Sequence, residues 1–252
     1  MFKRYQEPNP IVTPVVLVLN DVYWTPYVLA SIDGWFKKIV IYDAGSTDGT
    51  IEAIRHFEKS SNSELLIEEF PLVPPKAQLC YRNAAIADAG SEFYMIVDGD
   101  EVWTQEALMS FHENLGEFLR ARKLYGVVHR VEVKDPLDQA YSQDKFLPHH
   151  RLYHRSCTWR GTHPGERPTI PQKKGNEFRF PIETKVYHFH NTVRSPIAAP
   201  KREVRKGQKT YHRGEISSIN LLEEVPILRN RINPDLPINP NLEILQRSHA
   251  EV

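Results

Sequence analysis

The chain has 252 residues, with 32 Lys and Arg against 32 Asp and Glu, and two cysteines. A formal net charge of zero gives no overall field that attracts nucleic acid or an anionic membrane, and two cysteines are too few for a disulfide framework. The N-terminus lacks the hydrophobic segment of a signal peptide and no apolar run reaches the length of a membrane span, so we expect a cytoplasmic protein without an integral membrane segment.

The first half of the sequence alternates between short apolar runs and amphipathic segments. The runs predict strands at 15–19, 38–42, 65–70 and 93–98. The segments between them predict helices at 22–36 and 76–89, one helix that carries Ile51, Ile54 and Phe57, and one that begins near Thr104 and buries Leu108, Phe111, Leu115, Phe118 and Leu119. Continuous apolar strands are typical of a parallel sheet covered on both faces. The alternation predicts an α/β fold with a Rossmann-like, doubly wound, mostly parallel sheet flanked by helices.

The pattern changes after Gly126. Residues 127–133 and 151–155 alternate like half-exposed strands, residues 161–174 read as a loop, and residues 185–190 predict a last strand. A basic helix is expected at 201–211, and the prolines that follow Glu224 predict an extended tail that wraps the domain or contacts a neighbour. We therefore expect a main domain at 1–195, with halves at 11–125 and 126–195, and a helix with a proline-rich tail at 196–252. That tail is a candidate interface for a homo-oligomer.

Polar residues follow three of the predicted strands. Asn20-Asp21, Asp43 and Asp98 each stand where an apolar run ends, and ligands of open α/β sheets collect at the carboxyl ends of the strands. In Asp98-Gly99-Asp100 two carboxylates one residue apart can both reach a hard divalent cation, and Gly99 allows a tight turn between them. For an isolated motif of this kind, a solvated acidic turn is the simpler interpretation.

Longer motifs carry a resemblance to a known family. Asp43-Ala44-Gly45-Ser46-Thr47-Asp48-Gly49-Thr50 closely resembles the Asp-x-Gly-Ser-x-Asp-Gly-Thr signature of family 2 glycosyltransferases, which have the GT-A fold. Arg82-Asn83-Ala84 followed by Asp98-Gly99-Asp100-Glu101 is similar to the Arg-Asn-x and Asp-x-Asp motifs of that family. Arg151-Leu152-Tyr153 and Trp159-Arg160-Gly161-Thr162-His163 resemble segments of bacterial members that glycosylate surface polysaccharides. The resemblance covers roughly the first three quarters of the chain.

The resemblance implies a metal-dependent, inverting transfer of a sugar from a nucleotide-diphosphate sugar, a UDP-sugar, to a hydroxyl of a glycan or a lipid-linked acceptor. It implies a smaller antiparallel portion on the acceptor side of the sheet. Asp43 would accept the ring N–H of uracil, although capping of the next helix alone also explains this loop. The residues expected at the nucleotide sugar are Leu19, Asn20, Asp43, Gly45, Ser46, Asp48, Arg82, Asp98 and Gly99. Those expected to hold manganese or magnesium are Asp98, Asp100, His188 and His190.

The catalytic base and the acceptor site are less marked in the sequence. Many family members carry a Glu-Asp pair that supplies the base, and none occurs at the matching place, so Glu166, Asp144 and Glu101 are the candidates. Trp103, Trp159 and His163 are candidates for the acceptor site, with packing as the alternative for both indoles. The adjacent His149 and His150 should face opposite ways on a strand, as surface or acceptor-site residues.

Two other functions remain open at this stage. A glycan- or nucleotide-binding module with the same sheet would need no base. A sugar-nucleotide nucleotidyltransferase would need a glycine-rich, basic phosphate loop after the first strand, and Asn20-Asp21-Val22-Tyr23 is unlike one.

Overall fold

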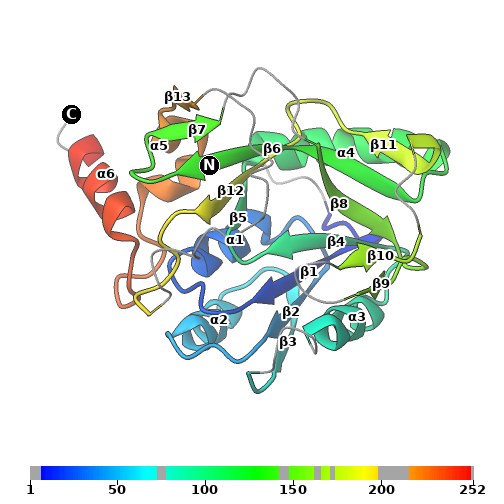
Figure 1. Ribbon diagram of the computed structural model, residues 1–252, viewed down its shortest axis with the longest axis horizontal. Coiled ribbons are helices and arrows are strands. Elements are labelled where there is room, and N and C mark those ends of the chain that lie inside the picture. The colour runs from blue at the N-terminus through cyan, green and yellow to red at the C-terminus, as the bar shows by residue number, and fades with distance from the viewer. Residues whose placement is uncertain are drawn as a thin grey trace.

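The computed structural model describes residues 7–72, 78–141, 148–161, 166–170, 174–197 and 216–250. Its centre is a mixed sheet of eleven strands, with a separate two-stranded pair beside it (Figure 1). The strands are β1 (Val12–Val18), β2 (Lys38–Asp43), β3 (Glu64–Glu69), β4 (Phe93–Asp98), β5 (Glu101–Trp103), β6 (Tyr125–Lys134), β7 (Gln139–Tyr141), β8 (Pro148–His154), β9 (Trp159–Arg160), β10 (Arg167–Pro168), β11 (Glu177–Arg179), β12 (Lys185–Asn191) and β13 (Ile216–Ser218). The helices are α1 (Thr25–Ile32), α2 (Thr50–Glu58), α3 (Gln78–Ala89), α4 (Gln105–Arg120), α5 (Leu221–Glu224) and α6 (Pro240–Ala250), with 3-10 turns η1 (Lys174–Asn176) and η2 (Pro226–Arg229).

The parallel part of the sheet has the order β3-β2-β1-β4, which confirms the predicted doubly wound α/β arrangement. β1, β2 and β4 are buried on both faces, whereas the edge strand β3 has no fully buried residue. In β1, Val16 belongs to the larger core cluster that α1 and α4 share, and Val15 belongs to a second cluster with Ala85 and Ile86 of α3. The chain moves outward from β1 to β3 and then returns to the other side of β1 to form β4. The point where the strand order reverses therefore lies between β1 and β4.

The antiparallel portion begins beyond β4. β8 runs antiparallel to β4 and to β6, and β6 continues the sheet to β7 and β13. β12 lies parallel to β6 and antiparallel to β5, a short strand that the sequence did not reveal. From His188 to Asn191, β12 advances three residues while β6 advances two, from Glu132 to Lys134, so β12 carries a bulge there.

The expected half-exposure of the 127–133 strand is wrong. β6 is buried at every position except Arg130 and Lys134, which are half-buried. Strands flank it on both edges, and apolar residues on both of its faces belong to the two core clusters: Val128, Val131 and Val133 to the larger one and Tyr125 to the smaller. The alternation of apolar and polar residues in β6 therefore does not mean that one of its faces is exposed to solvent.

The helices of the first half follow the predictions closely. α4 begins after Thr104, whose side-chain oxygen accepts a hydrogen bond from the Ala107 N–H at 3.1 Å, and it buries Leu108 and Phe111 as expected. α1 is shorter than the expected 22–36 and has Pro26 in its first turn, where a missing N–H costs nothing. No helix in the described part of the chain combines the length and apolarity that crossing a membrane requires.

The C-terminal segment is not the extended tail that its prolines suggested. Pro226 opens η2 and Pro240 opens α6, positions at which a backbone N–H has no helical partner in any case. Leu228 and Leu242 are fully buried in the core cluster that also contains β1, so this segment completes the main core. The helix expected at 201–211 lies outside the described residues, and a role of the tail in self-association stays a prediction.

Candidate active site

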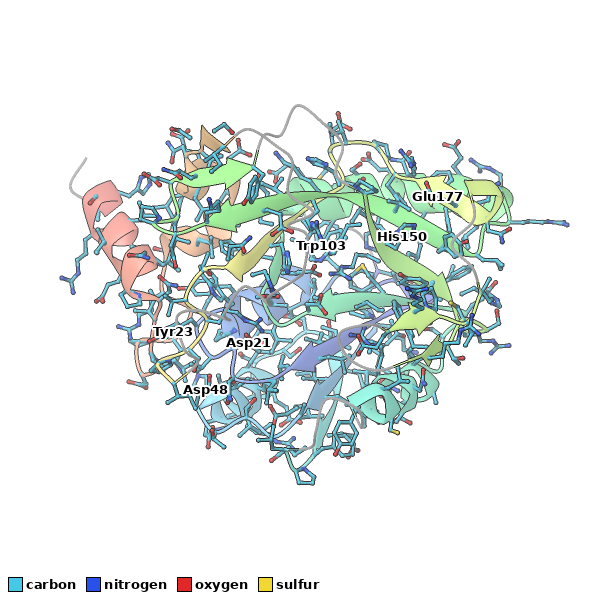
Figure 2. All side chains as sticks on the ribbon, viewed as in Figure 1. Asp21, Tyr23, Asp48, Trp103, His150 and Glu177 are labelled. Atoms are coloured by element: carbon cyan, nitrogen blue, oxygen red, sulfur yellow. The ribbon has the colours of Figure 1, made fainter. Side chains whose placement is uncertain are left out.

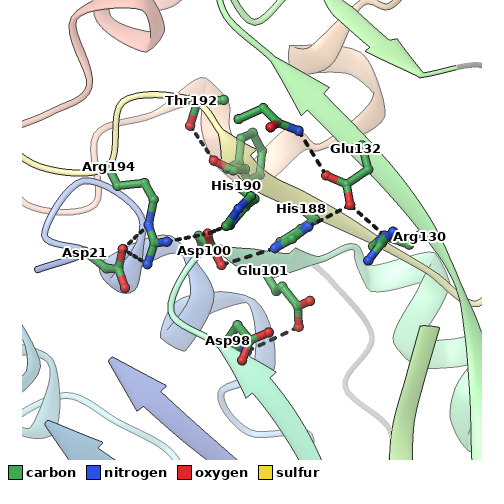
Figure 3. A network of polar contacts seen from close by, with 12 residues as sticks. Asp21, Asp98, Asp100, Glu101, Arg130, Glu132, His188, His190, Thr192 and Arg194 are labelled. Carbon is green, nitrogen blue, oxygen red and sulfur yellow. Dashed lines mark hydrogen bonds and ion pairs between the residues drawn. The ribbon is translucent and has the colours of Figure 1, made fainter. Parts of the chain in front are cut away.

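Charged side chains from four elements meet at the reversal point of the sheet. Figure 3 shows Asp21 from the end of β1, Asp98 and Asp100 from the end of β4, the histidines of β12, and Arg194 from the loop after β12. The β5–β12 pairing places His188 opposite Glu101, and the Phe189 N–H donates to the Asp100 carbonyl at 2.9 Å. The turn after β4 is thereby held against β12, which follows it some ninety residues later in the chain.

Of the four predicted metal ligands, Asp100, His188 and His190 form one cluster, whereas Asp98 belongs to a neighbouring group. Asp100 Oδ1 lies 3.5 Å from His188 Nε2, and Asp100 Oδ2 lies 3.9 Å from His190 Nδ1. The two imidazole rings stack with centroids 5.3 Å apart, so both histidines face the same way, as the strand alternation predicted. One ligand atom from each of the three residues lies within 4.8 Å of the others.

The partners of these residues fit a divalent cation. His188 Nδ1 lies 2.9 Å from Glu132 Oε1, which leaves Nε2 directed at Asp100, and a carboxylate behind a ligating imidazole is the usual way of fixing its orientation. Burial lowers the pKa of His188, but Asp100 and Glu132 outweigh it and raise this pKa to about 10, so the two carboxylates favour a positive charge here, and a bound metal ion would replace the proton on Nε2. Asp100 Oδ2 is buried and makes no hydrogen bond among the described residues, although Arg194 Nη1 lies 3.3 Å from it as an ion-pair partner. A carboxylate with two imidazoles suits manganese better than magnesium.

A second group, Asp98, Glu101 and His188, adjoins the first. Arg151 donates to Asp98 Oδ2 at 2.7 Å and also to Glu101 Oε1. Glu101 Oε1 lies 2.6 Å from His149 Nε2, and its other oxygen accepts the Asp98 N–H at 3.2 Å. Burial raises the pKa of Glu101 to about 7 against the opposing charge of Arg151, whereas Arg151 and Arg82 outweigh burial and lower the pKa of Asp98.

The loop after β2 surrounds Asp43. Its Oδ2 accepts the N–H groups of Gly45 and Ser46 at 3.1 and 2.9 Å, which closes a tight turn. Gly45 has a positive φ of 94°, and a Cβ there would stand 2.3 Å from the Leu72 backbone nitrogen, so no other residue fits. Asp43 Oδ1 is buried and has no hydrogen-bond partner in the described ranges, so one acceptor of this carboxylate remains for a ligand.

Solved structures are similar to part of this chain. The chain matches S. aureus TarS over 57% of its own length and 28% of TarS, with 17% identity and a TM-score of 0.43. It matches the TarS 1-349 complex with UDP over 57% of its length and 47% of that chain, with 17% identity and a TM-score of 0.44. It matches glucosyl-3-phosphoglycerate synthase from Mycobacterium tuberculosis, in complex with Mn²⁺, UDP and glucosyl-3-phosphoglycerate, over 48% of its length and 44% of that chain, with 18% identity and a TM-score of 0.35.

The chain thus spans less than half of each of these proteins, and similarity of this extent assigns no activity to it. No protein-family model matches the sequence, and no curated protein matches it.

The remaining residues predicted at the nucleotide sugar fall into two groups. Around the Asp43 loop, contacts within the protein occupy most polar atoms: Asn20 N–H donates to Ser46 Oγ at 2.9 Å, and Asp48 accepts the N–H groups of Val22 at 3.2 Å and Thr50 at 3.0 Å. Leu19 is half-buried beside Asn20. These contacts hold the loop against the turn after β1, whereas the N-cap position of α2, Gly49, has no side-chain cap, so capping alone does not explain the loop.

Arg82 lies on α3 with its guanidinium 5.0 Å from the Trp159 ring centroid, and its charge lowers the pKa of Asp98. Trp159 is itself fixed, since its backbone N–H and carbonyl both bond to the Asn83 amide at 2.9 Å. Gly99 is required for close packing, because a Cβ there would stand 2.9 Å from Val18 Cγ1 and 3.0 Å from Asp21 Oδ2.

The predicted bases and acceptor residues are less well accounted for. Glu101 is fully buried with both oxygens engaged, which suits a group that holds Asp98 and Arg151 in place. Trp103 is buried in the core beside Phe111, a packing position. Glu166 is half-buried directly before β10, and Asp144 and His163 lie outside the described residues.

His149 and His150 do face opposite ways, but His149 is not a surface residue. His149 contacts Glu101 in the site, whereas His150 Nε2 lies 3.3 Å from Glu177 Oε2 on the other face of β8 (Figure 2). Burial and the Arg151 charge lower the pKa of His149, so it meets Glu101 as a neutral ring.

Other members of the site are Glu132, Arg151 and Arg194, which were missed, and Asp21, which was noted at a strand end but given no role. Each acts through a partner more than thirty residues away in sequence, so only the strand pairing brings their charges together. One signal was present: Asp21 stands at the end of the first strand, the same kind of position as Asp43 and Asp98.

Proposed function

We propose that this protein transfers a sugar from a nucleotide-diphosphate sugar, a UDP-sugar, to an acceptor hydroxyl, with a divalent cation at Asp100, His188 and His190. The observation that carries the proposal is that this cluster lies at the reversal point of a doubly wound sheet, where such folds bind nucleotides, and that the Asp43 loop lies on the same strand-end edge on the other side of β1. The GT-A motifs noted in the sequence support it, because Asp43 belongs to one of them and Asp98 and Asp100 to another.

The donor site follows from the chemistry of these groups. Asp43 Oδ1 supplies an acceptor for the ring N–H of uracil, which distinguishes uracil from cytosine, whose matching nitrogen carries no hydrogen. Asp98, partly exposed, stands between the metal cluster and Arg151, where ribose or phosphate groups would be expected. When bound, manganese would stabilise the negative charge of the departing diphosphate.

Transfer requires that the acceptor oxygen lose its proton as it bonds to the sugar carbon and the bond to the diphosphate breaks. Glu166 and Asp144 are the candidate bases, and we expect inversion at the sugar carbon. The acceptor would be a hydroxyl of a glycan or of a lipid-linked molecule.

Calorimetry with UDP, CMP and GDP, each with and without Mn²⁺, tests the donor site. We expect UDP to bind the wild type with Mn²⁺ at least tenfold more tightly than without it, and Asp100→Asn to abolish the difference. Asp235→Asn, an exposed carboxylate of the tail, is the matched control and should bind as the wild type does. Equal binding of UDP with and without the ion, or preference for another nucleotide, would refute the proposed site.

A second measurement separates catalysis from binding. An enzyme should release UDP from a UDP-sugar slowly even without an acceptor, because water can replace the acceptor hydroxyl. If UDP-glucose, UDP-galactose and UDP-N-acetylglucosamine all bind and remain intact over many hours, the chain is a nucleotide-binding module and not a transferase.

A further inference from the structure

Arg194 joins two carboxylates that come from different strands. Its Nε and Nη2 both donate to Asp21 Oδ1 at the end of β1, and its Nη1 lies 3.3 Å from Asp100 Oδ2 (Figure 3). The Asp21 side chain is almost completely buried, and the Arg194 side chain is 15% exposed. One edge of the guanidinium is thus anchored to Asp21, while the remaining nitrogen is directed at the proposed metal ligand.

The oxygen that Arg194 contacts is the one that a metal ion would use. Asp100 Oδ2 is the atom that faces His190 Nδ1 at 3.9 Å, so the guanidinium stands beside the space between these two ligand atoms. A positive charge at that distance repels a divalent cation, and the Asp100 side chain that both would contact is buried. Arg194 and a metal ion therefore compete for the same carboxylate oxygen.

A nucleoside diphosphate provides Arg194 with a better partner. Phosphate oxygens accept charge-assisted hydrogen bonds from a guanidinium, and a diphosphate carries more negative charge than one carboxylate. Because the Nε and Nη2 edge already holds Asp21, Nη1 can change partner without moving the side chain out of the site. The Val193 carbonyl next to it is fixed by the Trp24 indole N–H at 3.1 Å and the Asn239 amide at 2.7 Å, which keeps the backbone of Arg194 in place.

We propose that Arg194 couples metal binding to diphosphate binding: it occupies Asp100 until the diphosphate of the donor draws it away, so that ion and nucleotide each favour binding of the other. This inference rests on the proposed function, and it makes Arg194 the residue that distinguishes a nucleoside diphosphate from a monophosphate. By linkage, the factor by which UDP tightens Mn²⁺ equals the factor by which Mn²⁺ tightens UDP.

The test measures Mn²⁺ affinity by calorimetry and by the electron paramagnetic resonance of free Mn²⁺, with no additive and with UDP, UMP or uridine. In the wild type, we expect UDP to tighten Mn²⁺ at least tenfold and UMP or uridine to leave it within twofold. In Arg194→Gln, Mn²⁺ alone should bind at least fivefold more tightly than to the wild type, and the effect of UDP should become smaller by the same factor, because only the direct attraction between ion and diphosphate remains.

Arg194→Lys and Arg247→Gln are the controls. The lysine keeps the positive charge, so Mn²⁺ alone should bind it as weakly as it binds the wild type, which separates charge from a loss of folding. Arg247 is exposed on α6 and pairs only with Glu243 among the described ion pairs, so its substitution should change nothing.

The outcomes separate this inference from the proposed function. If the wild type binds UDP with Mn²⁺ but Arg194→Gln shows the same Mn²⁺ affinity and the same effect of UDP, the role of Arg194 is refuted and the donor site stands. If the wild type binds no UDP under any condition, both proposals are refuted.

Discussion

Asn239 provides a direct test of the unexpected helical tail. Its Oδ1 accepts the N–H groups of Asn241 at 2.8 Å and Leu242 at 3.2 Å at the start of α6, and its Nδ2 donates to the Val193 carbonyl. Loss of an N-cap costs about 1 kcal/mol, and loss of a buried hydrogen bond costs about 1 kcal/mol more. We therefore expect Asn239→Ala to lower the free energy of unfolding by about 2 kcal/mol.

Urea unfolding followed by circular dichroism measures this change. With a slope of about 3 kcal/mol per molar urea, the midpoint should fall by about 0.7 M while the slope stays constant. Asn239→Ser is the matched variant, because serine still caps the helix but cannot reach Val193, so it should lose only about half as much. An Asn239→Ala midpoint within 0.1 M of the wild type, or a serine variant as unstable as the alanine variant, would refute this account of how the tail is held.

Three further predictions concern the site, the core and the cysteines. Gly99→Ala should cost about 1–3 kcal/mol of stability and weaken UDP binding, because its Cβ would crowd Val18 and Asp21. The control is Gly116→Ala on the exposed side of α4, where the nearest atom is 3.9 Å from the added Cβ, and it should stabilise the protein slightly in the same unfolding assay. Burial, with the Lys185 and Arg130 charges, lowers the pKa of His129 to about 4. As the pH falls, the unfolded state takes up this proton before the folded state does, so the free energy of unfolding should fall between about pH 6.5 and 4, by up to about 3 kcal/mol. A His129→Gln variant whose stability depends on pH as the wild type's does would contradict this. Cys80 is exposed and Cys157 is buried with a raised pKa, so a thiol reagent should titrate one cysteine at once and the other only on unfolding; two fast thiols would be the contrary result.

The helices and strands that depend on local sequence pattern could be predicted. The four strands of the parallel half and the helix after Thr104 depend on apolar runs, helical spacing and capping residues that lie within a few positions of one another. The tail was misjudged because four prolines were counted as helix breakers, although Pro226 and Pro240 each stand at the first residue of a helical turn. A proline that begins a helix and one that prevents it look alike until the cap, here Asn239, is recognised.

The residues of the site also divide into those that local pattern predicts and those that only the fold brings together. Asp100, His188 and His190 were predicted because each lies in or next to a strand that the apolar pattern predicts, and strand alternation placed both histidines on one side. Arg194 and Glu132 were not, because their roles come from contacts with Asp21, Asp100 and His188 across the sheet. Sequence gives no sign that a particular arginine lies beside a metal ligand rather than in solvent.

The bulge in β12 makes the length of this segment matter as much as its composition. The extra residue lies between His188 and Asn191, in the stretch that carries His190 and a few positions before Arg194. Deleting one codon there would restore regular pairing with β6 and turn every later side chain by one position, away from Asp21 and Asp100. In a mutational library, single-residue deletions between His188 and Arg194 should be eliminated more completely than most substitutions at the same positions.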